Sequence, residues 1–109
     1  MAQFGGGCKA LGGGGMRAMC VATVLVEDAR VRVTRFDFAP GAETGWHRHG
    51  HDYVITALTD CTMELEEPGG GRRQVLVPAG TAYRRAAGVE HNVINAGTEE
   101  MRFVEVELL

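Results

Sequence analysis

From residue 21 onward the chain consists of short apolar and β-branched runs separated by turn signals such as Ala39-Pro40-Gly41 and Pro78-Ala79-Gly80. The runs recur at intervals of about 8–12 residues, which is typical of an all-β sandwich or barrel. No stretch holds the period of an amphipathic helix. We therefore predict these strands: Val21–Glu27, Val31–Phe38, Thr44–His49, Tyr53–Thr59, Thr62–Glu67, Gln74–Val77, Ala82–Arg85, His91–Asn95 and Met101–Leu108.

Two of the predicted strands, 62–67 and 101–108, alternate apolar and acidic residues. A period of two indicates one buried and one solvent-facing side. We expect the apolar positions in the core and the acidic ones in solvent: Met63, Leu65, Val104, Val106 and Leu108 against Glu64, Glu66, Glu105 and Glu107.

The strand Val31–Phe38 does not keep one phase, because its apolar positions move from odd to even numbers. A β-bulge near Thr34-Arg35 would explain this slip, since a bulge inserts one extra residue into a strand.

The first 15 residues contain seven glycines, in two blocks. Such a segment buries too little apolar surface to offset the entropy lost on ordering. We expect residues 1–20 to be a flexible Gly-rich tail and residues 21–109 to form a single β-barrel domain.

Composition narrows the class of protein. The chain has 109 residues, 45% hydrophobic and 23% charged, with a net charge of -3 and scattered basic residues. These values fit one globular domain and give no basic strip for nucleic acid and no apolar run for a membrane. The three cysteines, Cys8, Cys20 and Cys61, are irregularly spaced, which argues against a disulfide framework. No secretory signal is visible, so we expect a cytoplasmic protein.

Candidate chemistry is concentrated in the histidines, because three of the four lie within five residues, at His47, His49 and His51. Alternate residues of a strand share a face about 6.6 Å apart, so His47 and His49 can reach one ion. Tyr53 has the same parity if the strand continues, whereas Gly50 leaves the direction of His51 open. The fourth histidine, His91, completes a three-histidine face if its strand lies beside the first.

Three protein ligands leave positions open for water or substrate, as in catalytic metal sites. The alternative is that the histidines form a surface cluster without a ligand. Arg84 and Arg85 precede the second histidine segment, and one of them could hold an anionic substrate by a bidentate contact. Both could equally lie on a solvated strand face.

The two histidine segments resemble the two motifs of the cupin superfamily. The first reads Gly41-(five residues)-His47-x-His49-(three residues)-Tyr53, and the second reads Ala86-Ala87-Gly88-(two residues)-His91-(three residues)-Asn95. Ala86 stands where the second motif has Pro, and Tyr53 stands where the first has Glu. The chain is most similar to the short cupins associated with β-alanine degradation, which share its HxHxHDY-type and AGxxHNxxN-type segments.

The resemblance implies a small antiparallel β-barrel of jelly-roll type, a homodimer, and metal ligation by His47, His49 and His91. His51 is a possible extra ligand. Replacement of the acidic ligand by Tyr53 implies a more neutral site, in which Tyr53 either donates a hydrogen bond to substrate or packs at the barrel mouth. Apolar walls are expected from Ile55, Met63, Val93 and Val104.

Three functions remain open from the sequence. The first is a metal-dependent enzyme for a small carboxylate or carbonyl compound. With Fe(II) it would be a dioxygenase, and with Zn or Ni an isomerase or hydrolase; Mn is a further candidate. The second is a non-catalytic module that binds a metal or small ligand for a pathway or sensor. The third is a metal-free barrel with the histidines as pocket dipoles.

Overall fold

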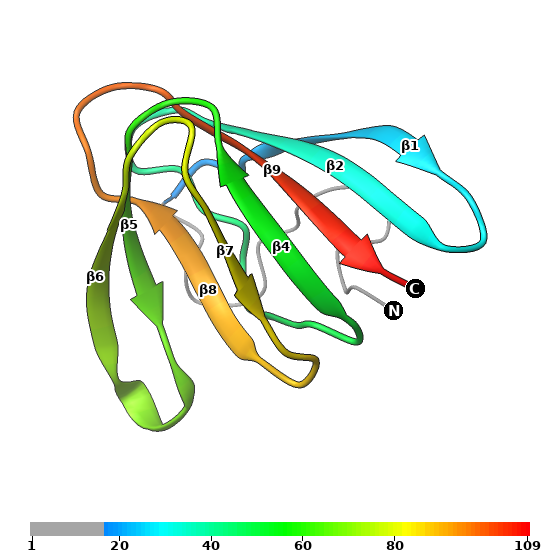
Figure 1. Cartoon of the computed structure of the whole chain (residues 1–109). Coiled ribbons are helices and arrows are strands. Elements are labelled where there is room, and N and C mark those ends of the chain that lie inside the picture. The colour runs from blue at the N-terminus through cyan, green and yellow to red at the C-terminus, as the bar shows by residue number, and fades with distance from the viewer. Residues whose placement is uncertain (1–16) are drawn as a thin grey trace.

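The computed structural model describes residues 17–109, which fold into two antiparallel sheets packed face to face (Figure 1). One sheet has five strands in the order β1-β2-β9-β4-β7 and the other has four in the order β3-β8-β5-β6. The strands are β1 (Val21–Glu27), β2 (Val31–Phe38), β3 (His47–Arg48), β4 (Asp52–Ala57), β5 (Cys61–Glu66), β6 (Arg72–Val77), β7 (Ala82–Arg85), β8 (Glu90–Asn95) and β9 (Met101–Leu108).

This arrangement confirms the predicted all-β jelly-roll fold. Within residues 17–109 a single 3-10 turn, η2 (Pro68–Gly70), interrupts the strands, and no helix there is long and apolar enough to cross a membrane. The turn signals located most strand ends within one or two residues. β3 is much shorter than the predicted Thr44–His49, because Gly45 takes a positive φ of 82° that breaks the extended backbone.

The predicted bulge in β2 is wrong. β2 pairs with β9 in continuous register from Val31 opposite Leu108 to Phe38 opposite Met101. The register shift lies on the neighbouring strand, between Val24 and Val26 of β1. The apolar positions of β2 change parity because the strand has apolar residues on both faces. Phe36 and Phe38 face the core, whereas Val31 and Val33 lie on the opposite face.

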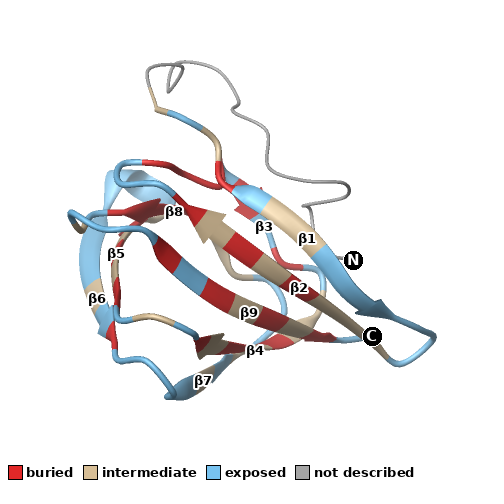
Figure 2. Cartoon of the chain, turned by 90° about the horizontal axis from the view of Figure 1, so that it is seen from above, coloured by how far each residue is buried: buried red, intermediate tan, exposed pale blue. Residues whose placement is uncertain are grey.

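Aromatic rings and a thioether fill the space between the sheets. Figure 2 shows the buried positions along the strands. Phe36 and Phe38 of β2 are fully buried, and each ring centroid lies 5.4 Å from that of Phe103 on β9. Met63 of β5 packs into the same cluster from the opposite sheet. Truncation of one such Phe to Ala costs about 3–5 kcal/mol of stability, so this cluster fixes how the sheets pack.

The last strand is inverted relative to the prediction. Glu105 and Glu107 point into the barrel and are each 2% exposed, while Leu108 is 41% exposed and Val104 and Val106 are half-buried on the outer face. The glutamates share parity with Met101 and Phe103, whose bulky side chains are buried in the core. The expected wall residue Val104 is therefore on the other side of the sheet.

The described part of the chain begins with residues that we had assigned to the tail. Ala18 and Cys20 exchange backbone hydrogen bonds with Glu43, and Cys20 is buried. The expectation for residues 1–16 lies outside the described residues.

Candidate metal centre

Two adjacent strands bring the two histidine segments together. β3 pairs with β8 so that His47 lies directly opposite His91. His49 lies just beyond β3, held by backbone hydrogen bonds from His49 N to Val89 O and from Gly88 N to His49 O, both 2.8 Å. Gly88 has a φ of 98°, which L-residues with a Cβ rarely adopt, so glycine suits this turn.

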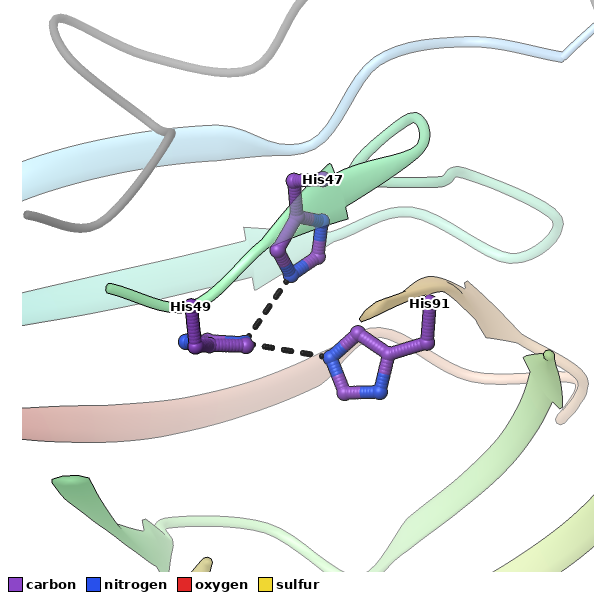
Figure 3. A group of neighbouring side chains, drawn as sticks. All are labelled: His47, His49 and His91. Carbon is purple, nitrogen blue, oxygen red and sulfur yellow. Dashed lines mark hydrogen bonds between the residues drawn. The ribbon is translucent and has the colours of Figure 1, made fainter. Parts of the chain in front are cut away.

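The three imidazoles converge through their Nε2 atoms (Figure 3). The Nε2 atom of His49 lies 3.1 Å from that of His47 and 3.1 Å from that of His91. The rings are nearly perpendicular to one another, and the side chains are 2–6% exposed. Among residues 17–109 these three make up the cluster that could hold a metal ion.

The tautomer of His47 follows from its surroundings. Its Nδ1 lies 2.9 Å from the carbonyl oxygen of Gly45, which can only accept, so Nδ1 carries the proton. Burial lowers the pKa of His47 to about 4, and the ring is therefore neutral at pH 7. Its Nε2 then presents a lone pair to the cluster, as a metal ligand must.

The other two rings are also neutral. Burial is the main cause that lowers the pKa of His49 to about 3 and that of His91 to about 2. A neutral His49 has at most one proton on Nε2, and a single N–H cannot point at both neighbours at once. With His47 Nε2 unprotonated, one of the two 3.1 Å contacts is left without an aligned proton.

A shared cation fits this donor set. Two nitrogens bound 2.0–2.1 Å from one ion and 90° apart lie about 3.0 Å from each other, close to the 3.1 Å observed. The cavity that the histidines line has a volume of about 10 Å³, which is room for one ion or water. The residues present therefore suit a small transition-metal ion.

Glu105 lies behind His49, on the side away from the cluster. Its Oε1 is 3.7 Å from His49 Nδ1, and its Oε2 is buried without a hydrogen-bond partner. Burial and the neighbouring Glu107 raise the pKa of Glu105 to about 8. A carboxyl behind a ligating imidazole commonly orients the ring and raises its basicity.

Tyr53 covers one face of the His49 ring. Its ring stacks on that of His49 with centroids 3.8 Å apart and planes 15° apart. Its hydroxyl is buried without a hydrogen-bond partner, and burial raises its pKa well above the ordinary value. The hydroxyl is therefore protonated at pH 7 and can donate a hydrogen bond. Tyr53 lines the cavity as well as packing in the core.

His51 lies outside the cluster and is half-buried. The next residue, Asp52, turns toward β7 and its following loop, where it accepts hydrogen bonds from Arg84 Nη2 and Ala87 N, each 2.8 Å. The Asp52 carboxylate thereby ties the start of β4 to the loop that precedes His91.

A buried polar network holds the segment that precedes His47. Asn92 Oδ1 accepts a hydrogen bond from Gly45 N at 3.0 Å, and Asn92 Nδ2 donates to Glu43 Oε1 at 2.7 Å. Thr44 Oγ1 lies 3.2 Å from His47 Nδ1 and accepts a hydrogen bond from Val93 N. These contacts hold the segment before β3 against β8 and so set the direction of His47.

The fold and the histidine geometry together define a cupin, and a family model described as a cupin domain matches residues 34–107. The chain belongs to this family. It is 61% identical to the β-alanine degradation protein BauB of Pseudomonas aeruginosa over 92 residues, which cover 84% of this chain and 96% of that protein.

Solved structures agree with the assignment. A cupin domain from Bordetella pertussis is 44% identical, with a TM-score of 0.82, over 85% of this chain and 96% of that one. The polyketide cyclase RemF from Streptomyces resistomycificus matches with a TM-score of 0.66 at 23% identity, over 84% of this chain and 68% of that one. The second likeness concerns the fold alone.

The sequence reasoning missed Glu105, Glu43, Thr44 and Asn92 as residues near the site. Glu105 could have been found from the parity of Met101 and Phe103, which share its face of β9. Asn92 and Thr44 carried no comparable signal, because their roles depend on the pairing of two distant segments. Asn95 closes the turn after β8 by donating to Glu99 O and accepting from Gly97 N, and it also donates to Phe38 O.

Proposed function

We propose that this chain binds one divalent transition metal through His47, His49 and His91 and uses it on a small carboxylate or carbonyl compound. The observation that carries the proposal is the convergence of three neutral imidazoles on one ion-sized cavity. Fe(II) is the first candidate, with Mn, Ni and Zn behind it, because imidazole ligands suit all of them.

The chemistry divides between the ion and the chain. Iron(II) at three histidines supplies open positions for substrate and dioxygen, as dioxygenase chemistry requires. The chain holds the three imidazoles neutral by burial. Tyr53 is our candidate catalytic residue, since it lines the cavity and its protonated hydroxyl, buried without a hydrogen-bond partner, can donate to a developing negative charge.

The second candidate function is a non-catalytic module that binds a metal or a small ligand. The small cavity is consistent with it, because about 10 Å³ is enough for an ion. The name of BauB supports a place in the breakdown of β-alanine under either function.

We also propose a homodimer formed by the outer face of the five-stranded sheet. Val33, Val106 and Val54 lie side by side there in register, and Val26 pairs with Val33 at the edge. Val26 is 49% and Leu108 41% exposed in the single chain. A second copy would remove this apolar surface from water.

The deciding experiment is metal analysis of untagged protein, followed by anaerobic reconstitution with Fe(II) and an oxygen-electrode assay with small carboxylates. We expect close to one metal per chain and oxygen uptake with at least one substrate. If the protein binds metal but shows no oxygen uptake with any substrate and any metal tested, the non-catalytic binding module is favoured. Less than about a tenth of an equivalent of every metal tried would contradict the metal-dependent enzyme.

A further inference from the structure

The two arginines of β7 point in opposite directions. Arg84 faces outward, 65% exposed at its side chain, and its guanidinium is bound to Asp52 at 2.8 Å. Arg85 is half-buried and lies on the same face as Tyr83, because the strand alternates exposed and half-buried residues. Tyr83 lines the histidine cavity. Arg85, the last residue of β7, is therefore directed toward the interior of the barrel.

The register of the sheet places Arg85 beside the site. Arg85 pairs with Tyr53 on β4, and the Tyr53 ring is stacked on His49. Tyr53 in turn pairs with Glu107 on β9. The Tyr53 side chain therefore lies between Arg85 and the inward-facing carboxyl group of Glu107. Glu107 faces its own cation, Arg32, at 3.5 Å.

Arg85 has no protein partner in the described part of the chain, since no hydrogen bond or ion pair there involves it. Its positive charge also reaches the site, where it is a lesser cause, after burial and the neighbouring histidines, of the lowered pKa of His49 and of His91. By contrast, the other arginine whose charge reaches His91, Arg73, is paired with Glu67 at 3.0 Å. An unpaired, half-buried guanidinium is a site for an anion.

We propose that Arg85 binds the carboxylate of a short organic acid whose other end reaches the histidine cluster. This inference rests on the proposed function and narrows its substrate class to anionic acids. The planar guanidinium offers two parallel N–H groups to one carboxylate. It also repels cationic ligands.

The test uses 3-hydroxypropionate and its uncharged amide as probes, measured by calorimetry on cobalt-loaded protein and on metal-free protein. Arg85→Gln removes the charge, Arg85→Lys keeps it, and Arg84→Gln is the matched control on the outer face. We expect the acid to bind Arg85→Gln at least about 10-fold more weakly than wild type. Arg84→Gln should match wild type, and Arg85→Lys should fall between.

The affinity of the amide for wild-type protein should be no higher than the affinity of the acid for Arg85→Gln. Equal binding of acid and amide, equal binding by wild type and Arg85→Gln, or no binding of the acid at millimolar concentration would overturn the proposal. Cobalt titration of each variant before the probe is added separates the two hypotheses. If the wild-type protein does not bind cobalt, the proposed metal site is contradicted. The titrations of metal-free protein with the acid and the amide would still decide whether Arg85 binds a carboxylate. Circular dichroism checks that each variant is folded.

Discussion

Glu105 Oε1 lies 3.7 Å from Nδ1 of His49, with both side chains 2% exposed. This pair joins the last strand of the chain to the first histidine segment. The family's first motif places its acid at the position of Tyr53, where it could bind the ion directly. Here the nearest inward carboxyl lies on β9 and approaches the opposite nitrogen of a histidine.

We expect Glu105→Gln to weaken cobalt binding by about 10- to 100-fold, because the residue behind a ligating histidine orients the ring and raises its basicity. The free energy of unfolding of the metal-free protein should not fall, since the change removes a buried carboxyl with an unsatisfied oxygen. Cobalt titration and urea unfolding measure the two effects. Glu100→Gln, on an exposed side chain, is the control. Equal losses of stability and affinity would point to a purely structural role.

His91→Ala and His51→Ala should differ sharply. His91 is one of the three converging imidazoles that we propose as ligands, so its removal should abolish tight metal binding while the protein stays folded. His51 lies outside the cluster, and its removal should leave metal affinity within about twofold of wild type. Metal content after dialysis and thermal unfolding check both variants. Loss of metal in His51→Ala would show that His51 belongs to the site.

Asn92→Ala should destabilise the chain by about 2 kcal/mol or more. The change leaves the buried Gly45 N–H without its acceptor, which costs about 1–3 kcal/mol. It also removes a hydrogen bond from Glu43, which keeps its ion pair with Arg17. Gln74→Ala, on an exposed position of β6, should cost little. Urea unfolding at pH 7 measures both. A loss for Asn92→Ala no larger than that of the control would mean that water replaces the network.

The clamp made by Asp52 should depend on pH. The hydrogen bond from Ala87 N, followed by that from Arg84, lowers the pKa of Asp52 from its ordinary 3.8. A carboxylate whose pKa is lower in the folded state contributes stability that is complete above the unfolded pKa and is lost as the pH falls through the folded pKa. Wild type should therefore be more stable than Asp52→Asn at pH 7, and the difference should shrink at pH 3. A difference that is the same at both values would rule out this contribution.

The proposed dimer face can be tested with Val106→Lys. Val106 lies at the centre of the outer apolar face, between Val33 and Val54. A lysine there should convert a dimer to a monomer in analytical ultracentrifugation, because it places a charge in the contact, and the monomer should remain folded. Gln74→Lys, on the other sheet, should leave the assembly unchanged. A wild-type protein that sediments as a monomer would contradict the proposal at once.

The strand list and the cupin motifs were readable from the sequence, because turn residues mark the strand ends and the histidine spacing is specific. The inversion of β9 was not. A period of two shows which residues share a face, but the side that is buried depends on the neighbouring sheet. Val104 and Val106 line an apolar outer face, and Glu105 lies inside because its carboxyl has a place behind His49. The opposite directions of Arg84 and Arg85 likewise required the pairing of β7 with β4.

β3 has two residues and forms the edge of its sheet, paired with β8 alone. Segments of this kind open locally at a much lower free-energy cost than the whole domain. An ion held by His47 and His49 would thus be released when residues 44–50 lift away from β8, with the phenylalanine core still intact. The rate of metal exchange should follow the stability of this edge and not that of the barrel, so the protein could be loaded or stripped of its metal without unfolding.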